Sequence, residues 1–296
     1  MEPKNMRAAN FEAARTFIYT HARLLDRYLF AALFDGGSSQ AVIDALQAYQ
    51  NPDGGFGNAL EPDLRTPTSQ PLAVERALIY MDLDSGFSDS TLPRVCDWLM
   101  TVTTLQGRVP FALPGLEGYP HTPWMVADDL SAGTGPGRLN PTASLCGLLL
   151  KHGVRNAWVE RASAYCWQEI PGFDSTAFHD VMPVVEFLEH VPTQHDRAAT
   201  ELDRIRERVA QPGVVTLDPL AEGYIQSPLD WAPRPDHPLR PIFDNATIQT
   251  HLAVLAARQQ PDGGWPISWQ ALSPAAEAEW RGWITIEALC KLKAYR

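Results

Sequence analysis

One octapeptide, QNPDGGFG at residues 50–57, returns in altered form as QQPDGGWP at residues 259–266. In both copies a helical pattern ends at the glutamine, and the proline two residues later prevents the helix from continuing. The Pro-Asp-Gly-Gly segment is typical of a tight turn, because glycine readily adopts a positive φ. The aromatic residue that follows, Phe56 or Trp265, can then pack back against the helix ends. The repeat therefore predicts helices that are joined by one recurring turn.

The spacing of the two copies indicates a repeat protein. Asp53 and Asp262 are 209 residues apart, which is about five units of about 42 residues, a period found in paired-helix repeats. We interpret QGRVPF at residues 106–111 as a worn third copy. No segment shows sustained alternation of apolar and polar residues, so the sequence predicts an all-α fold.

Helical periodicity, prolines and capping residues set the expected helices. Asn140 before Pro141, Asp174 and Asp244 are in position to cap the helices that follow them. The predicted helices span residues 8–34, 40–49, 70–81, 92–104, 141–151, 157–169, 175–189, 194–209, 246–259 and 285–295.

The turn resembles the QW repeat of the squalene and oxidosqualene cyclases and of the protein prenyltransferase β subunits, the terpene cyclase and prenyltransferase-like superfamily. The resemblance implies an α/α toroid, a barrel of paired inner and outer helices. We expect a single domain over residues 1–296 with long loops at about 106–139 and 212–243. In this superfamily the helices after the turns line a central cavity. Here that would place four helices at the cavity wall: 70–81, 141–151, 175–189 and 285–295.

Composition narrows the choice of partners. The formal net charge is −11, which argues against nucleic acid or an anionic membrane as the main partner, because both need a basic surface. No apolar run approaches the length of about 18 residues that spans a bilayer, so we expect no stable membrane insertion. The four cysteines lie in apolar runs without a CxxC pair, as expected of reduced core thiols in a cytoplasmic protein. The oligomeric state is left open.

Cyclases of the squalene-hopene type begin their reaction by protonating the substrate with an aspartic acid of a D-x-D-D motif. The run most similar to it is VADDLS at residues 126–131. Asp128 and Asp129 match the last two acids, whereas Val126 stands where the first belongs. The resemblance implies that Asp128 and Asp129 are catalytic, and the alternative is a solvated pair of loop residues.

A second polar cluster directly follows the first turn. Glu61 and Asp63 are candidate catalytic acids, and Arg65, Gln70 and Glu75 are candidate substrate-binding residues. Paired carboxylates beside an arginine form either an acid–base set or a clamp on a polar ligand. The alternative is a salt-bridged loop.

Further candidates come from helix position and from aromatic chemistry. His179 and Asp180 lie near the start of a predicted cavity helix. Ring faces stabilise carbocations, and Trp124, Trp231, Trp280 and Trp283 cluster in or near predicted loops.

The motifs of other enzyme classes are missing from the sequence. It contains no DDxxD, no HExxH, no G-x-S-x-G and no zinc-binding pattern of the prenyltransferase type. We therefore expect no metal and no cofactor. The leading hypothesis is a metal-independent, acid-initiated cyclase, an isomerase or lyase of a hydrophobic, terpenoid-like small molecule.

Two alternatives remain. One is a carbohydrate-active enzyme on a similar toroid, for which two carboxyl groups would face each other about 5 to 10 Å apart. The other is a non-catalytic toroid that binds a lipid or a protein partner.

Overall fold

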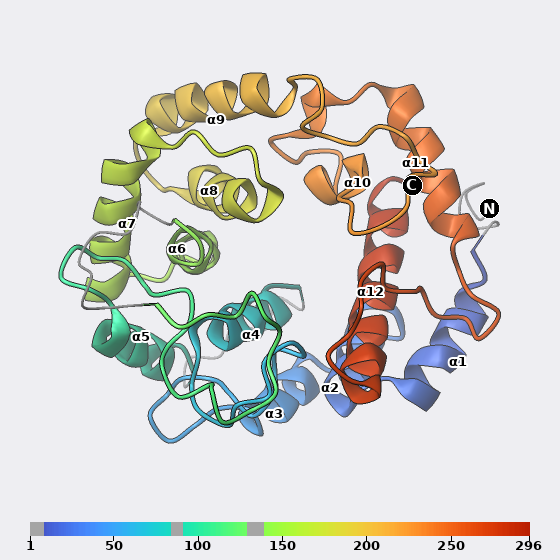
Figure 1. Cartoon of the computed structure of the whole chain (residues 1–296), viewed down its shortest axis with the longest axis horizontal. Helices are drawn as coiled ribbons and strands as arrows, with labels where there is room; N and C mark the ends of the chain where they lie inside the picture. The colour runs from blue at the N-terminus through green and yellow to red at the C-terminus, as the bar shows by residue number, and fades with distance from the viewer. Residues whose placement is uncertain (1–8, 84–90, 129–138) are drawn as a thin grey trace. The chain divides into compact units, whose positions relative to one another are not determined.

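The fold is all-α, as the sequence predicts. The computed structural model describes residues 9–83, 91–128 and 139–296, and every regular element in these ranges is a helix (Figure 1). Two isolated bridges occur besides them, Gln50 with Phe56 and Leu64 with His121. No helix in the described ranges is both long and apolar enough to cross a bilayer.

The chain forms two compact units. Unit 1 comprises the described residues up to Ala31 together with Ile205–Arg296, and unit 2 comprises Ala32–Arg204. Toroidal closure, and a single domain over residues 1–296, stay predictions.

Unit 2 carries most of the helices that concern function. They are α3 (Ser39–Gln47), α4 (Pro71–Leu83), α5 (Thr91–Val102), α6 (Thr142–Lys151), α7 (Ala157–Glu169), the 3-10 turn η2 (Ile170–Gly172), α8 (Phe178–His190) and the larger part of α9 (His195–Val209). Helices α4, α6 and α8 lie side by side with α6 in the middle, and α7 packs against both α6 and α5 (Figure 1). The unit is therefore built in two helical layers.

Helix α6 is the centre of unit 2. Its residues from Thr142 to Leu149 are all buried, and α4, α7 and α8 pack against it. Gly147 permits the close packing of α6 on α8, because a Cβ at this position would lie 2.7 Å from backbone atoms of Glu186. This contact places the last turns of α8 directly beside α6.

Unit 1 contains the first and the last helices of the described chain. Its helices are α1 (Phe11–His21), α2 (Leu24–Phe34, most of which lies in this unit), α10 (Pro228–Trp231), the 3-10 turn η3 (Arg240–Ile242), α11 (Asn245–Ala257) and α12 (Pro274–Ala294). Helix α12 packs against α1 and α11, and α10 packs against α11. Lys291 of α12 is buried and ion-paired with Asp230 of α10 and, at 3.2 Å, with Glu287.

Two helix predictions are wrong in their bounds. The single helix expected over residues 8–34 is broken into α1 and α2 at Ala22, whose backbone is extended and whose carbonyl accepts a hydrogen bond from the Arg27 side chain at 2.9 Å. The helix expected at 285–295 is the end of α12, which begins after Ser273, whose hydroxyl accepts from the Ala276 N–H at 3.2 Å.

Of the three predicted helix caps, one is confirmed and two are wrong. Asp244 is confirmed, because its carboxylate accepts from the Thr247 N–H at 2.7 Å. Asn140 is not the cap of α6, since its side chain donates instead to the His179 carbonyl at 2.8 Å. Asp174 is not the cap of α8, which begins after Ala177.

Within the described ranges the recurring turn occurs at three places. In the first, the Gly54 N–H donates to the Asn51 carbonyl at 3.0 Å, and the Asn51 N–H donates to the Gly55 carbonyl at 2.8 Å. In the second, the corresponding pair joins Gly263 to Gln260 at 2.9 Å and Gln260 to Gly264 at 2.8 Å.

The worn copy adopts the same backbone. The Gly107 N–H donates to the Thr104 carbonyl at 3.0 Å, and the Thr104 N–H donates to the Arg108 carbonyl at 2.8 Å. The φ angles of Gly54, Gly107 and Gly263 are +97°, +103° and +94°. The third copy is thus confirmed, with residues 103–110 as the window that matches 50–57.

The predicted period is wrong. Gly54, Gly107 and Gly263 are separated by 53 and 156 residues, and 156 is three times 52. From α3 to α11 the described chain also advances by four helix pairs. The repeat is therefore about 52 residues long and not about 42, because the connections inside each pair are longer than a bare helix hairpin needs.

Candidate functional site

The carboxyl of Glu75 on α4 is a buried ionisable group of unit 2 with a strongly shifted pKa. The Ser144 hydroxyl on α6 donates a hydrogen bond to its Oε1. Burial raises the pKa of Glu75 to about 7; the Ser144 hydrogen bond and the Arg76 charge act to lower it, and Glu61 and Glu186 act to raise it. A carboxyl of this kind can hold a proton at neutral pH and also release it, as general acid–base catalysis requires.

The sequence explains why Glu75 is held in this environment. Its neighbours on α4, Val74, Ala77 and Leu78, are fully buried, so the apolar packing of the helix fixes the position of its polar residue. The first turn sets the start of α4, because the Gln70 N–H donates to the Phe56 carbonyl at 2.9 Å.

Glu61 lies beside this group as part of an ion pair. Its Oε2 accepts from Nε and Nη2 of Arg76 at 3.1 and 3.0 Å, and it is buried. Asp63 is also buried, and its carbonyl accepts from the Thr122 N–H at 3.1 Å. The ion pair corresponds to the salt-bridged alternative for this cluster.

Asp128 is ion-paired and mostly buried. Its carboxylate contacts Arg108, and its N–H donates to the Ala112 carbonyl at 3.0 Å. Asp129 lies outside the described residues. The structure therefore gives Asp128 a cationic partner instead of the solvated surroundings of the alternative interpretation.

Gln70 and Arg65 hold the long loop after α5 in place. The side-chain oxygen of Gln70 accepts from the Leu113 N–H at 2.8 Å, and its amide donates back to the Leu113 carbonyl at 3.3 Å. The Arg65 N–H donates to the Pro120 carbonyl at 3.0 Å. In the same loop the Trp124 ring is 55% exposed.

His179 and Asp180 lie at the start of α8. Burial lowers the pKa of His179, and the charge of Asp180 opposes this shift. Asp180 accepts a hydrogen bond from the Ser175 hydroxyl at 2.8 Å.

The other predicted aromatic residues belong to unit 1. Trp231, Trp280 and Trp283 are buried, with 2%, 8% and 8% of their surface exposed. Trp280 packs edge-on against Trp269 with ring centroids 5.2 Å apart. Trp280 and Trp283 lie within α12, and Trp231 is the last residue of α10, so these three lie in helices and not in loops.

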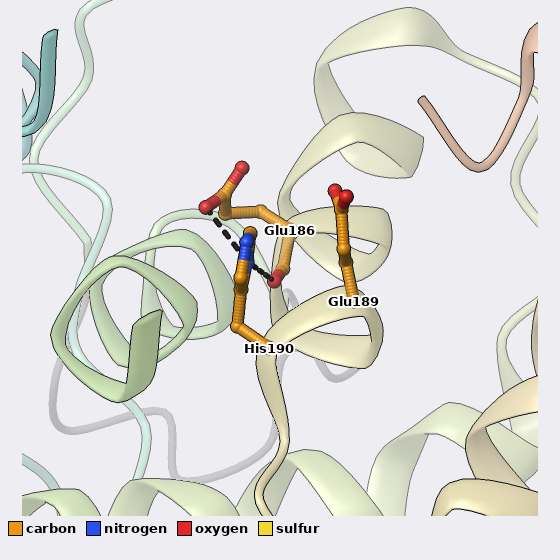
Figure 2. A group of neighbouring side chains, drawn as sticks. All are labelled: Glu186, Glu189 and His190. Carbon is orange, nitrogen blue, oxygen red and sulfur yellow. Dashed lines mark hydrogen bonds and ion pairs between the residues drawn. The ribbon is translucent and has the colours of Figure 1, made fainter. Parts of the chain in front are cut away.

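Four further residues of unit 2 are candidates that the sequence patterns did not predict. Ser144 contacts Glu75 directly. Glu186, Glu189 and His190 occupy the end of α8, where their candidate ligand atoms all lie within 4.8 Å of one another (Figure 2). The Glu-x-x-Glu-His pattern places these three on one face of a helix, a signal that could have been read from the sequence.

Comparisons with known proteins show the fold. No family model matches the sequence, and no curated protein matches it. The chain is similar to a protein from Actinoplanes whose crystal structure is known, with a TM-score of 0.60 and 15% identity over 98% of this chain and 99% of that chain.

Proposed function

We propose that the chain is an enzyme in which Glu75 donates a proton, and that its reaction is the metal-independent, acid-initiated cyclisation of a terpenoid-like substrate. The observation that carries the proposal is a buried carboxyl with a pKa of about 7 that is hydrogen-bonded to Ser144. In this assignment Glu75 replaces Asp128 and Asp129 as the initiating acid.

Acid-initiated cyclisation makes three demands on a carboxyl group. It must be protonated at the working pH, its proton must be held in a defined direction, and it must be shielded from water. Burial meets the first and third demands at Glu75. The Ser144 hydroxyl donates to Oε1, which leaves Oε2 to carry the acidic proton in this proposal. Transfer of that proton forms a C–H bond at one alkene carbon and leaves a carbocation at the other.

The proposal is tested with linear polyprenyl probes in deuterated buffer that contains EDTA. Squalene, farnesyl diphosphate and geranylgeranyl diphosphate are incubated with the protein, and products are analysed by mass spectrometry. We expect a cyclic product that carries one deuterium from solvent. Glu75→Gln should lower the rate about 100-fold or more, the usual contribution of a general acid.

Glu160→Gln provides the matched control, because Glu160 is an exposed residue of α7. It should leave the rate unchanged. Cyclic products without solvent deuterium, an undiminished rate for Glu75→Gln, or no turnover of any probe would each contradict the proposed function.

The protonation of Glu75 can be measured without a substrate. Its pKa is about 7 in the folded chain against an ordinary value of 4.5, so folding favours the protonated form. The stability that this proton contributes is complete below pH 4.5 and is lost as the pH rises through 7. The free energy of unfolding of Glu75→Gln minus that of the wild type should therefore rise across this window by about 3 kcal/mol. A difference independent of pH would refute the raised pKa.

A further inference from the structure

We propose that the last turn of α8 binds a divalent transition-metal ion of the Zn²⁺ type through Glu186, Glu189 and His190. The three side chains extend from one turn of helix, and their candidate ligand atoms lie within 4.8 Å of one another (Figure 2). This site does not depend on the proposed chemistry of Glu75.

The ligand types and their spacing suit such an ion. Residues at positions i, i+3 and i+4 share one helix face, so a single helix presents two carboxylates and one imidazole together. A mixture of nitrogen and oxygen ligands is typical of Zn²⁺. Three protein ligands would leave one position of a tetrahedral ion open to water.

One distance in the cluster already matches metal coordination. Nδ1 of His190 lies 3.1 Å from a carboxylate oxygen of Glu186, Oε1. Two ligands bonded to Zn²⁺ at about 2.0 Å in tetrahedral geometry are about 3.3 Å apart. A Zn²⁺ ion can therefore replace the proton between these two atoms with only small movements of the side chains.

A second observation concerns the carboxylate of Glu186. Its Oε1 is buried without a well-aligned hydrogen bond, and its neighbour at 3.1 Å is Nδ1 of His190. Nδ1 of His190 also lies 2.9 Å from the backbone carbonyl of Glu186, so its one proton is shared between two acceptors. A poorly satisfied buried carboxylate oxygen is costly, and a metal ion would remove that cost.

The electrostatic surroundings also favour a cation. The site lies at the C-terminal end of α8, where the helix dipole is negative. The negative charge of Glu186 acts on α4, where it contributes to the raised pKa of Glu75. On that side Arg76 is already bound by Glu61.

Unit 2 offers a matched pair that should not bind a metal. His152 contacts Asp82 at 2.7 Å, and Lys151 contacts the other oxygen of the same carboxylate at 2.9 Å. A lysine already pairs with this carboxylate, whereas the neighbour of the Glu186 oxygen is His190, itself a candidate ligand.

The experiment uses the full chain after treatment with EDTA and removal of the chelator. Zn²⁺ is added in a calorimetric titration, and Co²⁺ is added while visible absorption is recorded. We expect one ion per chain, with affinity at least tenfold weaker in His190→Ala, Glu186→Gln and Glu189→Gln. His152→Ala should bind as the wild type does, and circular dichroism should show that each variant is folded.

Wild-type protein alone also decides the question if a variant fails to fold. In an NMR spectrum of the imidazole nitrogens, Zn²⁺ should shift His190 and leave His152 in place. The proposal is overturned if no stoichiometric binding occurs, if binding survives His190→Ala, or if the His190 signals do not move. None of these results bears on the cyclase assay, because that assay contains EDTA.

Discussion

The turns at residues 50–57 and 259–266 share a backbone but differ in the partners of their side chains. In both, the aspartate accepts from the N–H of the second glycine at 3.0 Å. In both, the glutamine amide donates to the carbonyl of the first glycine, at 3.0 Å in one and 2.8 Å in the other. Phe56 and Trp265 are both buried. These features, which the two copies share, fix the geometry of the turn.

The partners around each turn are chemically different. Asp53 accepts a hydrogen bond from the Ser69 hydroxyl at 2.7 Å, whereas Asp262 accepts from the Arg281 guanidinium at 2.8 Å. Burial acts to raise the pKa of Asp262, but the Gly264 N–H and Arg281 lower it overall. The same turn is thus supported by a neutral partner in one copy and by a charged partner in the other. The turn therefore has a structural role, and we look for catalytic residues elsewhere in the chain.

The largest expected effect comes from removing the glycine that both turns require. A Cβ on Gly263 would lie 2.0 Å from the Ala13 carbonyl oxygen, and one on Gly54 would lie 2.4 Å from the Arg94 carbonyl oxygen. Both glycines also have positive φ. Gly263→Ala and Gly54→Ala should each lower the free energy of unfolding by about 3 kcal/mol or more, measured by urea denaturation.

Gly213→Ala separates strain from crowding. Gly213 has φ +86° and no heavy atom within 4 Å of its would-be Cβ, so its variant should lose only about 1 kcal/mol. Equal losses for Gly213→Ala and Gly263→Ala would show that the close backbone approach at the turn does not matter.

A smaller effect should distinguish the two aspartates. Asp53→Asn and Asp262→Asn should each cost about 1 kcal/mol, because each weakens hydrogen bonds at a turn. The cost of Asp262→Asn should shrink in high salt, since an exposed charge pair is screened. The cost of Asp53→Asn should not change with salt, because Ser69 is neutral. Unfolding at low and at high NaCl measures both, and the same salt dependence for the two variants would contradict the comparison.

The smallest effect belongs to the worn third turn. There the Thr104 hydroxyl accepts from the Arg108 N–H at 3.1 Å, which replaces the carboxylate of the other copies. Thr104→Ala should cost about 0.5 to 1 kcal/mol in urea unfolding. Thr200→Ala, at an exposed position of α9, should be neutral within about 0.5 kcal/mol. If both variants behave alike, Thr104 does not take over the role of the aspartate.

The local structure of the chain follows from its sequence. The helices, the recurring turn and the Asp244 cap depend on residues a few positions apart, so periodicity and turn chemistry predict them. The expected caps at Asn140 and Asp174 and the unbroken first helix were wrong; the Asn140 side chain bonds to the His179 carbonyl, 39 residues away in the chain. The period was misjudged because the third turn keeps its backbone while losing the aspartate that marks the others.

The candidate site also has one part that the sequence predicts and another that only the tertiary structure shows. The sequence alone drew attention to Glu61 and Glu75, since both follow the first turn, and it carries the Glu-x-x-Glu-His spacing of α8. Only the tertiary structure decided that Glu75 meets Ser144, which is 69 residues away, and that Glu61 is bound by Arg76. Whether a carboxyl keeps its proton depends on burial and on neighbouring charges, and these arise only when α4, α6 and α8 pack together.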